Sequence, residues 1–344
     1  MKFGKKSFPA LYEIYSNDEN AKGNITKTAK KYCELNNIAY DDTSRRAASK
    51  ILNRGMIKKD LPLVVNKEKH HSAKILFFDI ETSFIEYRGF SLYPNSIPHD
   101  NIINDWYILS FSAKWIFEDN FTSVGLTPQE ISKQDDKRLC QEIWKLIDEA
   151  DIIVAHNGNR FDIRKLNSRF IKHNLLLPSP FKSIDTLYHA KRVFGFTSNR
   201  LDYIAKFLGF DGKIENSKGL WHRVMAGEVE AMDLMIEYTE QDVRILEEVY
   251  LAMRPYMKGH VNLGLFITEN AEACPSCASN EIDWNLKTDY ITTSNVYRAG
   301  RCCSCGSLMR ARTPLYNAKN KSSLLIPLAG IYFKGGINFS PFLF

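Results

Sequence analysis

The apolar positions between residues 75 and 255 alternate in a strand-and-helix pattern. Residues 75–81 form a nearly continuous apolar run that ends in acids, which is typical of a central strand buried on both faces. Further strands are expected at 107–117, 121–126 and 151–156, and helices are expected at 137–149, 161–173 and 227–253. This order of elements predicts an α/β fold in which helices flank a mixed sheet.

The N-terminal part has a different pattern. Apolar positions at helical spacing predict a helix over 24–36 and a second one over 44–53, with a tight link between them. Two such helices favour a basic, helix-turn-helix-like module within residues 1–60, followed by a linker at 61–74. Residues 43–54 could then contact a DNA duplex. An ordinary helical hairpin with a charged face is the alternative.

Charge is distributed unevenly along the chain, although the net charge is only +6. Residues 1–74 hold 16 lysines and arginines against 8 acids, residues 75–254 hold 21 against 27, and residues 255–344 hold 9 against 5. Basic ends around an acidic middle suit a protein that touches a polyanion and needs carboxylates for metal. A solvated surface of uneven charge explains the same counts.

The sequence shows neither a secretion leader nor an apolar stretch of the roughly 20 residues that span a bilayer. We therefore expect a cytoplasmic protein without a membrane partner, in a bacterium or in a host cell if a phage encodes it. The seven cysteines agree with a reducing compartment, because five of them cluster near the C-terminus in pairs that suit metal binding.

Four acids and a tyrosine are the candidate catalytic residues. Asp79 and Glu81 lie two positions apart at a strand end and so share one face of that strand. Asp162 is expected at the start of a helix, and Tyr238 precedes Asp242 by one helical turn. Converging carboxylates can hold two divalent ions about 3.5–4 Å apart, an arrangement that can activate water and stabilise the charge of a phosphodiester during its cleavage.

Each acid also has an ordinary structural interpretation when it is taken alone. Asp79 could end a strand, Asp162 could cap a helix, and Asp242 could pair with Arg244. Three spaced motifs in the expected local structure favour the catalytic interpretation over these separate explanations.

Three of these segments resemble the exonuclease motifs of the DEDD (DnaQ-like) superfamily. They are Asp-Ile-Glu-Thr at 79–82, His-Asn-Gly-x-x-Phe-Asp at 156–162 and Tyr-x-x-x-Asp at 238–242. The third motif has a tyrosine in place of histidine and in this respect resembles the DEDDy branch, which includes proofreading domains of DNA polymerases. Residues 185–255 also resemble ribonuclease-H-like proteins of the YprB type. The resemblance covers 75–255, about half the chain.

The resemblance implies a 3′→5′ exonuclease that uses two Mg²⁺ or Mn²⁺ ions. Asp79, Glu81 and Asp242 would hold the first ion, and Asp79 with help from Asp162 the second. Tyr238 would position the attacking water. The residues that would contact the substrate are Thr82, Asn157 and Phe161.

Several alternatives stay open for this ribonuclease-H-like domain, expected at 75–257. A structure-selective endonuclease on the same fold would carry similar acids, and a DNA-binding regulator with an inactive core would share the flanking modules. The expected substrate is a single-stranded 3′ end, with DNA favoured, although no residue distinguishes DNA from RNA. A proofreading role would need a polymerase or a replication or repair partner.

Two further groups in this domain have no single interpretation. Tyr188, Lys191, Arg192 and Arg200 could grip backbone phosphates or form a solvated basic face. Asp185 and His156 are more simply explained as structural groups, and neither Trp221 nor His222 is given a role.

Two Cys-x-x-Cys pairs, separated by 24 residues, predict a zinc ribbon at 268–315. Cys274 and Cys277 form the first pair, and Cys302 and Cys305 the second, which leaves Cys303 as the spare. Four thiolates close the coordination shell, so one structural Zn²⁺ is expected; a disulfide or redox pair is the alternative. The arginines around this ribbon could contact nucleic acid or a protein. The apolar tail at 316–344 could pack on the domain or bind a partner.

Overall fold

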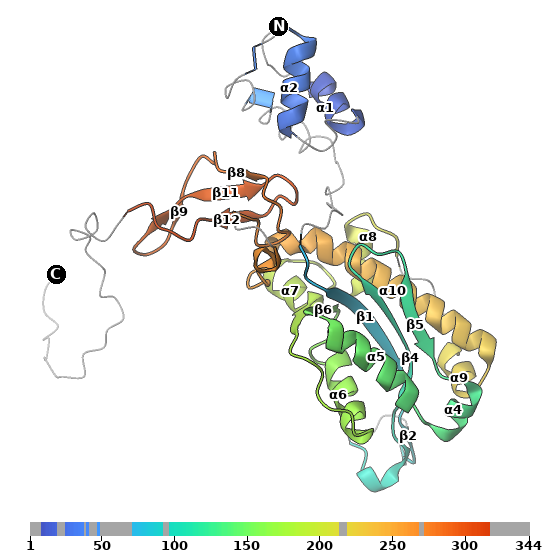
Figure 1. The fold of residues 1–344 in the computed structure, drawn as a ribbon. Coiled ribbons are helices and arrows are strands. Elements are labelled where there is room, and N and C mark those ends of the chain that lie inside the picture. Colours follow the sequence, from blue (N-terminus) through green and yellow to red (C-terminus); the bar gives the residue numbers. More distant parts are fainter. Residues whose placement is uncertain are drawn as a thin grey trace, which may run out of the picture. The chain divides into compact units, whose positions relative to one another are not determined.

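A computed structural model describes most of the chain (Figure 1). The described residues are 8–18, 25–37, 39–40, 47–48, 71–91, 96–212, 219–267 and 272–316. They fall into two compact units, one within Met1–Ile282 and Cys302–Ser307 and the other within Asp283–Arg301 and Leu308–Phe344. Most of the expected second N-terminal helix, most of the linker and nearly all of the apolar tail lie outside the described residues.

A five-stranded sheet in the order β5-β4-β1-β6-β7 forms the centre of the larger unit. The central strand β1 (Ile75–Thr82) runs antiparallel to β4 (Ile108–Trp115), which pairs in turn with β5 (Phe121–Gly125). On its other side, β6 (Ile152–Ala155) and β7 (Lys182–Asp185) follow in parallel. The predicted mixed sheet is confirmed.

Helices cover both faces of this sheet (Figure 1). They are α4 (Pro128–Lys133), α5 (Lys137–Glu149), α6 (Asp162–Lys172), α7 (Thr186–Val193), α8 (Leu201–Phe207), α9 (Leu220–Met225) and α10 (Val229–Met253). The apolar side chains of α5 and α6 join one core cluster, while those of α7, α8 and the second half of α10 join the other.

Strand β1 divides its side chains between these two clusters because successive residues of a strand point to opposite faces. Leu76 and Phe78 enter the cluster with α5 and α6, whereas Ile75 and Phe77 enter the cluster with α8 and α10. Asp79 and Glu81 are the next residues on the same face of β1 as Ile75 and Phe77. Acids at the end of β1 therefore face the side of the sheet that α10 covers.

The smaller elements complete the description of the chain. A short hairpin of β2 (Glu86–Tyr87) and β3 (Ile102–Asn104) follows β1, and the N-terminal helices α1 (Phe8–Asn17) and α2 (Ile25–Leu35) pack against each other. The prediction of a helix over 24–36 matches α2, whereas α1 was not predicted. Short 3-10 turns are found at His99–Asn101, Arg254–Tyr256 and Leu263–Phe266.

The C-terminal strands form two small sheets. Strands β8 (Ile282–Asp283), β11 (Ala299–Cys302) and β12 (Leu308–Arg310) make one, and β9 (Tyr290–Ile291) and β10 (Val296–Tyr297) make the other. With the four-cysteine cluster described below, they have the form predicted for a zinc ribbon.

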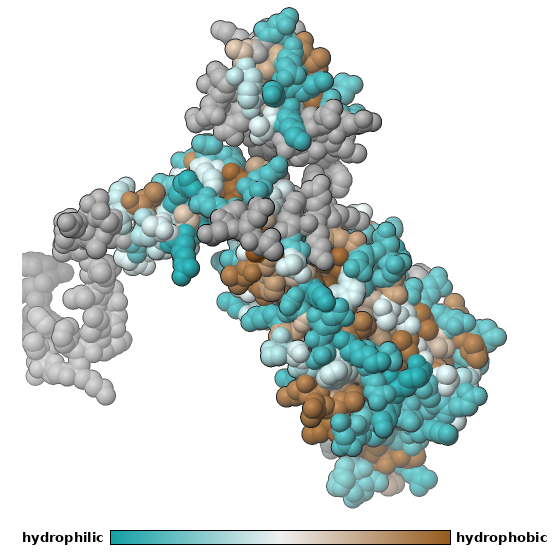
Figure 2. Space-filling view, in the orientation of Figure 1, coloured by the Kyte–Doolittle hydropathy of each residue, from teal (hydrophilic) through white to brown (hydrophobic). Residues whose placement is uncertain are grey.

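None of the described helices is long and apolar enough to cross a membrane. Hydrophilic residues make up much of the visible surface, and apolar residues lie among them in separate groups (Figure 2).

Candidate functional site

Three carboxylates converge where β1 meets α10. Asp79 and Glu81 follow the apolar part of β1, opposite Ser112 and Ser110 of β4, and the pairing shifts directly after Glu81. Asp242 projects from α10 and is almost completely buried. One oxygen from each of the three carboxylates lies within 4.8 Å of the other two. Strand and helix thus bring together acids that are more than 150 positions apart in the sequence.

This group of ligand atoms fits a hard divalent cation. All three donors are carboxylate oxygens, which Mg²⁺ and Mn²⁺ prefer over sulfur or imidazole ligands. Three carboxylates this close also repel one another when they are ionised, and a divalent cation between them relieves that repulsion. Asp79, Glu81 and Asp242 are therefore the residues that would hold such an ion.

Asp162 lies beside these acids but is not part of the same tight group. It begins α6, and its Oδ1 accepts a hydrogen bond of 3.4 Å from the backbone N–H of Ile80, the residue between Asp79 and Glu81. Burial, with a further contribution from the negative charge of Asp185, raises the pKa of Asp162 to about 7. A cation near this carboxylate would favour its ionised form.

Tyr238 lies one helical turn before Asp242 on α10, and both line the same cavity. The ring of Trp221, from α9, packs edge-on against the Tyr238 ring with centroids 6.3 Å apart. Trp221 had no role in the sequence interpretation, because nothing in the local pattern of α9 points to Tyr238. Its neighbour His222 packs instead against Phe84, with ring centroids 5.1 Å apart.

The loop between β6 and α6 is held by His156. Its Nδ1 lies 2.9 Å from the hydroxyl of Thr186, and its Nε2 lies 2.9 Å from the carbonyl oxygen of Asn199. Two residues later, a Cβ on Gly158 would come within 2.5 Å of the Ala155 Cβ, so any larger residue would push the loop off the strand. The histidine and the glycine of this motif therefore set the course of the backbone.

Asp185 fixes the same loop from the end of β7. Its carboxylate accepts hydrogen bonds from four backbone N–H groups, at 3.0–3.3 Å. Two of the donors, Asn157 and Asn159, belong to the loop, and the other two, Leu187 and Tyr188, form the first turn of α7. Asn157 has a φ of 73°, a conformation that asparagine adopts more readily than most residues.

A cavity of about 850 Å³ opens in front of the acids. Its lining comprises Asp79, Ile80, Glu81, His156, Asn157, Phe161, Leu187, Lys191, Asn199, Arg200, Leu201, Asp202, Lys206, Tyr238 and Asp242. Two of the three expected substrate contacts, Asn157 and Phe161, are part of this lining, and Thr82 is not. Cationic side chains therefore share the cavity with the carboxylates, although Lys206 pairs with Asp202.

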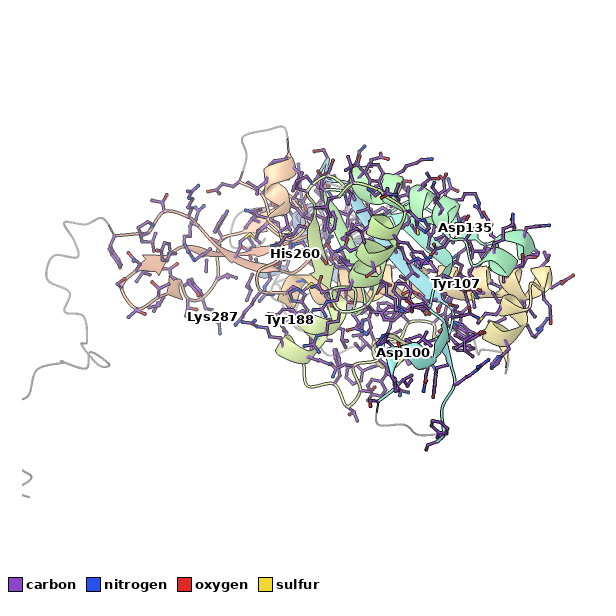
Figure 3. All side chains as sticks on the ribbon, turned by 90° about the horizontal axis from the view of Figure 1, so that it is seen from below. Asp100, Tyr107, Asp135, Tyr188, His260 and Lys287 are labelled. Carbon is purple, nitrogen blue, oxygen red and sulfur yellow. The ribbon has the colours of Figure 1, made fainter. Side chains whose placement is uncertain are left out.

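A second hollow, of about 410 Å³, continues from the first. The two share Asn157, Leu187 and Lys191, and the second adds Arg160, Tyr188 and Arg192 among its lining residues. Tyr188 is labelled on α7 in Figure 3, and its side chain is about half exposed. Three cations and an exposed aromatic ring beside the acid site form a surface suited to a nucleic-acid strand.

The four cysteines predicted to bind zinc come together at a second site. The sulfurs of Cys274 and Cys305 are 3.7 Å apart, and those of Cys277 and Cys302 are 3.5 Å apart. A tetrahedral zinc with Zn–S bonds near 2.3 Å separates its sulfurs by about 3.8 Å. Cys303 is exposed and is not part of this cluster, as the sequence predicted.

The two Cys-x-x-Cys turns have the same backbone conformation and hydrogen bond. The residue after each pair has a left-handed conformation, with φ of 62° at Ala278 and 75° at Gly306. Its N–H donates to the carbonyl oxygen of the first cysteine of the pair, at 2.8 Å to Cys274 and 3.0 Å to Cys302. Both turns thereby aim their sulfurs at one centre, which suits a closed structural metal site.

Comparisons with known proteins agree with the fold. Residues 113–254 match the model of the RNase H superfamily. Over 169 residues the chain is 31% identical to the PolC-type DNA polymerase III of Ureaplasma parvum, a match that covers 44% of this chain and 11% of that polymerase. The chain therefore carries an RNase H-like domain and corresponds to only a small part of this relative.

A solved structure shows a weaker likeness. The family B DNA polymerase from the hyperthermophilic archaeon Pyrobaculum calidifontis has 15% sequence identity and a TM-score of 0.40, over 67% of this chain and 34% of the polymerase.

Proposed function

We propose that this protein is a metal-dependent 3′→5′ exonuclease that hydrolyses single-stranded nucleic acid, with DNA as the favoured substrate. The observation that carries the proposal is the convergence of Asp79, Glu81 and Asp242 in a cavity that also contains Tyr238. The RNase H-like fold and the distant similarity to a DNA polymerase support it further. A polymerase or a replication or repair complex is the proposed partner.

The side chains divide the work of hydrolysis among them. Asp79, Glu81 and Asp242 would hold one divalent ion, and Asp79 with Asp162 would hold a second. Bound there, the ions would lower the pKa of water and offset negative charge on the phosphate. Tyr238 orients the attacking water with its hydroxyl group. It does not act as the general base, because a neutral phenol is a weak base at physiological pH.

The remaining lining residues would hold the strand. Phe161 is 38% exposed at the edge of the cavity, where its ring can stack on the base of the terminal nucleotide. Lys191 and Arg200 can meet the adjacent phosphates, and Arg160 and Arg192 those further along the second hollow. Asn157 lines both hollows, so its side-chain amide would meet the strand where it passes from one to the other.

The cleavage pattern of 5′-labelled single-stranded DNA and RNA tests this proposal in Mg²⁺ or Mn²⁺. An exonuclease yields a ladder of products that shorten from the 3′ end. An inverted nucleotide at that end should prevent this degradation. A structure-selective endonuclease would cut the blocked strand equally well. Binding without cutting would favour the DNA-binding regulator. The Asp79→Asn, Glu81→Gln double variant controls for contaminating nucleases.

A structural role for zinc completes the proposal. The Cys274, Cys277, Cys302 and Cys305 sulfurs would fill all four positions around one Zn²⁺, so no position is left for substrate. The metal would hold the two cysteine turns together and leave the chemistry to the carboxylate site.

A further inference from the structure

One face of the small C-terminal sheets carries aromatic and arginine side chains. Tyr290 pairs with Tyr297 across β9 and β10, so the two side chains lie on the same face. The Arg310 guanidinium lies 4.0 Å from the centroid of the Tyr297 ring and 5.9 Å from that of Tyr290. Arg310 thus lies close over Tyr297 and within reach of Tyr290, and the three side chains form one cluster.

The register of β11 and β12 extends this face. Arg301 pairs with Leu308, two positions from Arg310 along β12, and residues two apart in a strand share a face. Arg301, Leu308 and Arg310 are all exposed, whereas Gly300 and Cys302, on the opposite face, are buried. We call the residues Tyr290, Tyr297, Arg301, Leu308 and Arg310 the ribbon face.

Charge around the ribbon face is predominantly positive. The described part of this unit, residues 283–301 and 308–316, contains five basic residues and two acidic ones. Its basic residues are Lys287, Arg298, Arg301, Arg310 and Arg312, and its acids are Asp283 and Asp289. A second arginine stack lies nearby, where Arg298 covers the ring of Trp284 at 3.9 Å. Such a surface attracts a polyanion.

The combination of aromatic rings and guanidinium groups favours single-stranded nucleic acid over an acidic protein segment or a duplex. An acidic protein segment would need the arginines but would gain little from the exposed ring of Tyr290 and the half-buried ring of Tyr297. A single nucleic-acid strand uses both, because unstacked bases pack on aromatic and guanidinium planes while phosphates bind the arginine N–H groups. In a duplex the base faces are already stacked and cannot pack on the rings.

We propose that the ribbon face is a second binding site for single-stranded nucleic acid, in addition to the carboxylate cavity. One base stacks on Tyr290 and another on the Arg310 guanidinium that lies over Tyr297, and the N–H groups of Arg301 and Arg310 bind the phosphates between them. The proposal does not depend on hydrolysis, since every residue of the ribbon face lies in the smaller unit and none belongs to the candidate catalytic site.

Fluorescence anisotropy with the full chain tests the proposal directly. Two probes of equal length are compared: labelled oligothymidylate, and an abasic strand with the same number of phosphates. The Asp79→Asn, Glu81→Gln background prevents cleavage. Replacement of both tyrosines, Tyr290→Ala and Tyr297→Ala, should weaken oligothymidylate binding about tenfold and leave binding of the abasic strand nearly unchanged. Equal affinity of this variant and its parent for oligothymidylate would overturn the proposal.

Matched variants separate stacking from charge and from misfolding. Arg310→Lys keeps the charge but loses the planar group, so it should weaken oligothymidylate binding more than Lys287→Ala, which removes one charge from the loop between β8 and β9 (Figure 3). An unchanged circular-dichroism spectrum and an unchanged unfolding transition show that the tyrosine variants are folded.

Photo-cross-linking of a thiothymidine strand, followed by peptide mapping, provides an independent measurement. Cross-links in residues 290–301 and 308–310 are expected, and cross-links confined to the larger unit would contradict the proposal.

Discussion

The ring of Trp221 meets the ring of Tyr238 edge to face, with centroids 6.3 Å apart and planes inclined at 74°. An aromatic pair of this geometry restrains the rotation of both side chains. Tyr238 is proposed to orient water for hydrolysis, so the short helix α9 would determine how accurately it does so. Trp221 is accordingly a positioning residue and not a catalytic one.

Loss of this ring contact should slow hydrolysis. Trp221→Ala is expected to lower kcat about tenfold and leave KM little changed, because supporting residues around a catalytic site typically contribute 10- to 100-fold. Trp221→Phe should restore most of the activity. In a Tyr238→Phe background, Trp221→Ala should lower kcat almost no further. If the effects of the two substitutions on kcat were fully additive, this would contradict the positioning role.

Asp185 should matter for both stability and substrate binding. Asp185→Ala leaves four backbone N–H groups without their acceptor, so the free energy of unfolding should fall by about 2–3 kcal/mol. KM for a single strand should rise as well, since Asn157 lines the cavity. Denaturant titration and steady-state kinetics measure the two effects. The exposed Asp233→Ala on α10 is the control, and an equal loss of stability in both variants would contradict the assigned role.

A buried ionic network predicts how stability depends on pH. Asp136 is fully buried and accepts hydrogen bonds from Arg169 at 2.5 Å, His173 at 2.6 Å and the Ile108 N–H at 2.9 Å. Burial by itself would raise the pKa of Asp136, but the hydrogen bonds from Arg169, Ile108 and His173 outweigh it and hold this pKa below its usual value. The folded state therefore favours the ionised carboxylate.

The stabilisation by Asp136 should be complete above the pKa of an unfolded aspartate, about 4, and should disappear as the pH falls through the lower pKa of the folded state. Asp136→Asn should cost about 3–5 kcal/mol at neutral pH, because Arg169 then stays buried without its counter-ion. Urea titrations at neutral and acidic pH measure this difference. A difference between the two proteins that does not shrink in acid would contradict the network.

Zinc binding can be tested with a matched pair of cysteine variants. The wild-type protein and Cys303→Ser should each contain one zinc per chain by elemental analysis. Cys277→Ser should lose the metal and much of the stability of the C-terminal strands, since the closed site joins both cysteine turns. Retention of zinc by Cys277→Ser, or its loss from Cys303→Ser, would show that the ligands are assigned wrongly.

Elements and sites could be predicted from the sequence where the residues that define them are close together in the chain. The apolar run of β1, the amphipathic pattern of α5 and the two Cys-x-x-Cys pairs each lie within a few neighbouring residues, and each was predicted close to its observed place. The spacing of Tyr238 and Asp242 likewise predicts that both lie on one face of a helix, and both belong to α10.

What could not be predicted depends on contacts between distant segments. Strand β7 has only four residues, three of them polar, so its pattern does not differ from that of a loop. The network of Asp136 joins α5, α6 and β4, and the contact of Trp221 joins α9 to α10. Such roles follow from packing, because a single acid or tryptophan carries no periodic signal.

The most direct test of the carboxylate site is the rate at which Asp242→Asn releases nucleotides from single-stranded DNA in Mg²⁺, measured beside Asp233→Asn. Both variants remove one acid from α10, but only Asp242 lies with Asp79 and Glu81. We predict that Asp242→Asn loses at least about a hundredfold in rate and that Asp233→Asn stays within about twofold of the wild type. Wild-type activity in Asp242→Asn would contradict the proposed metal site.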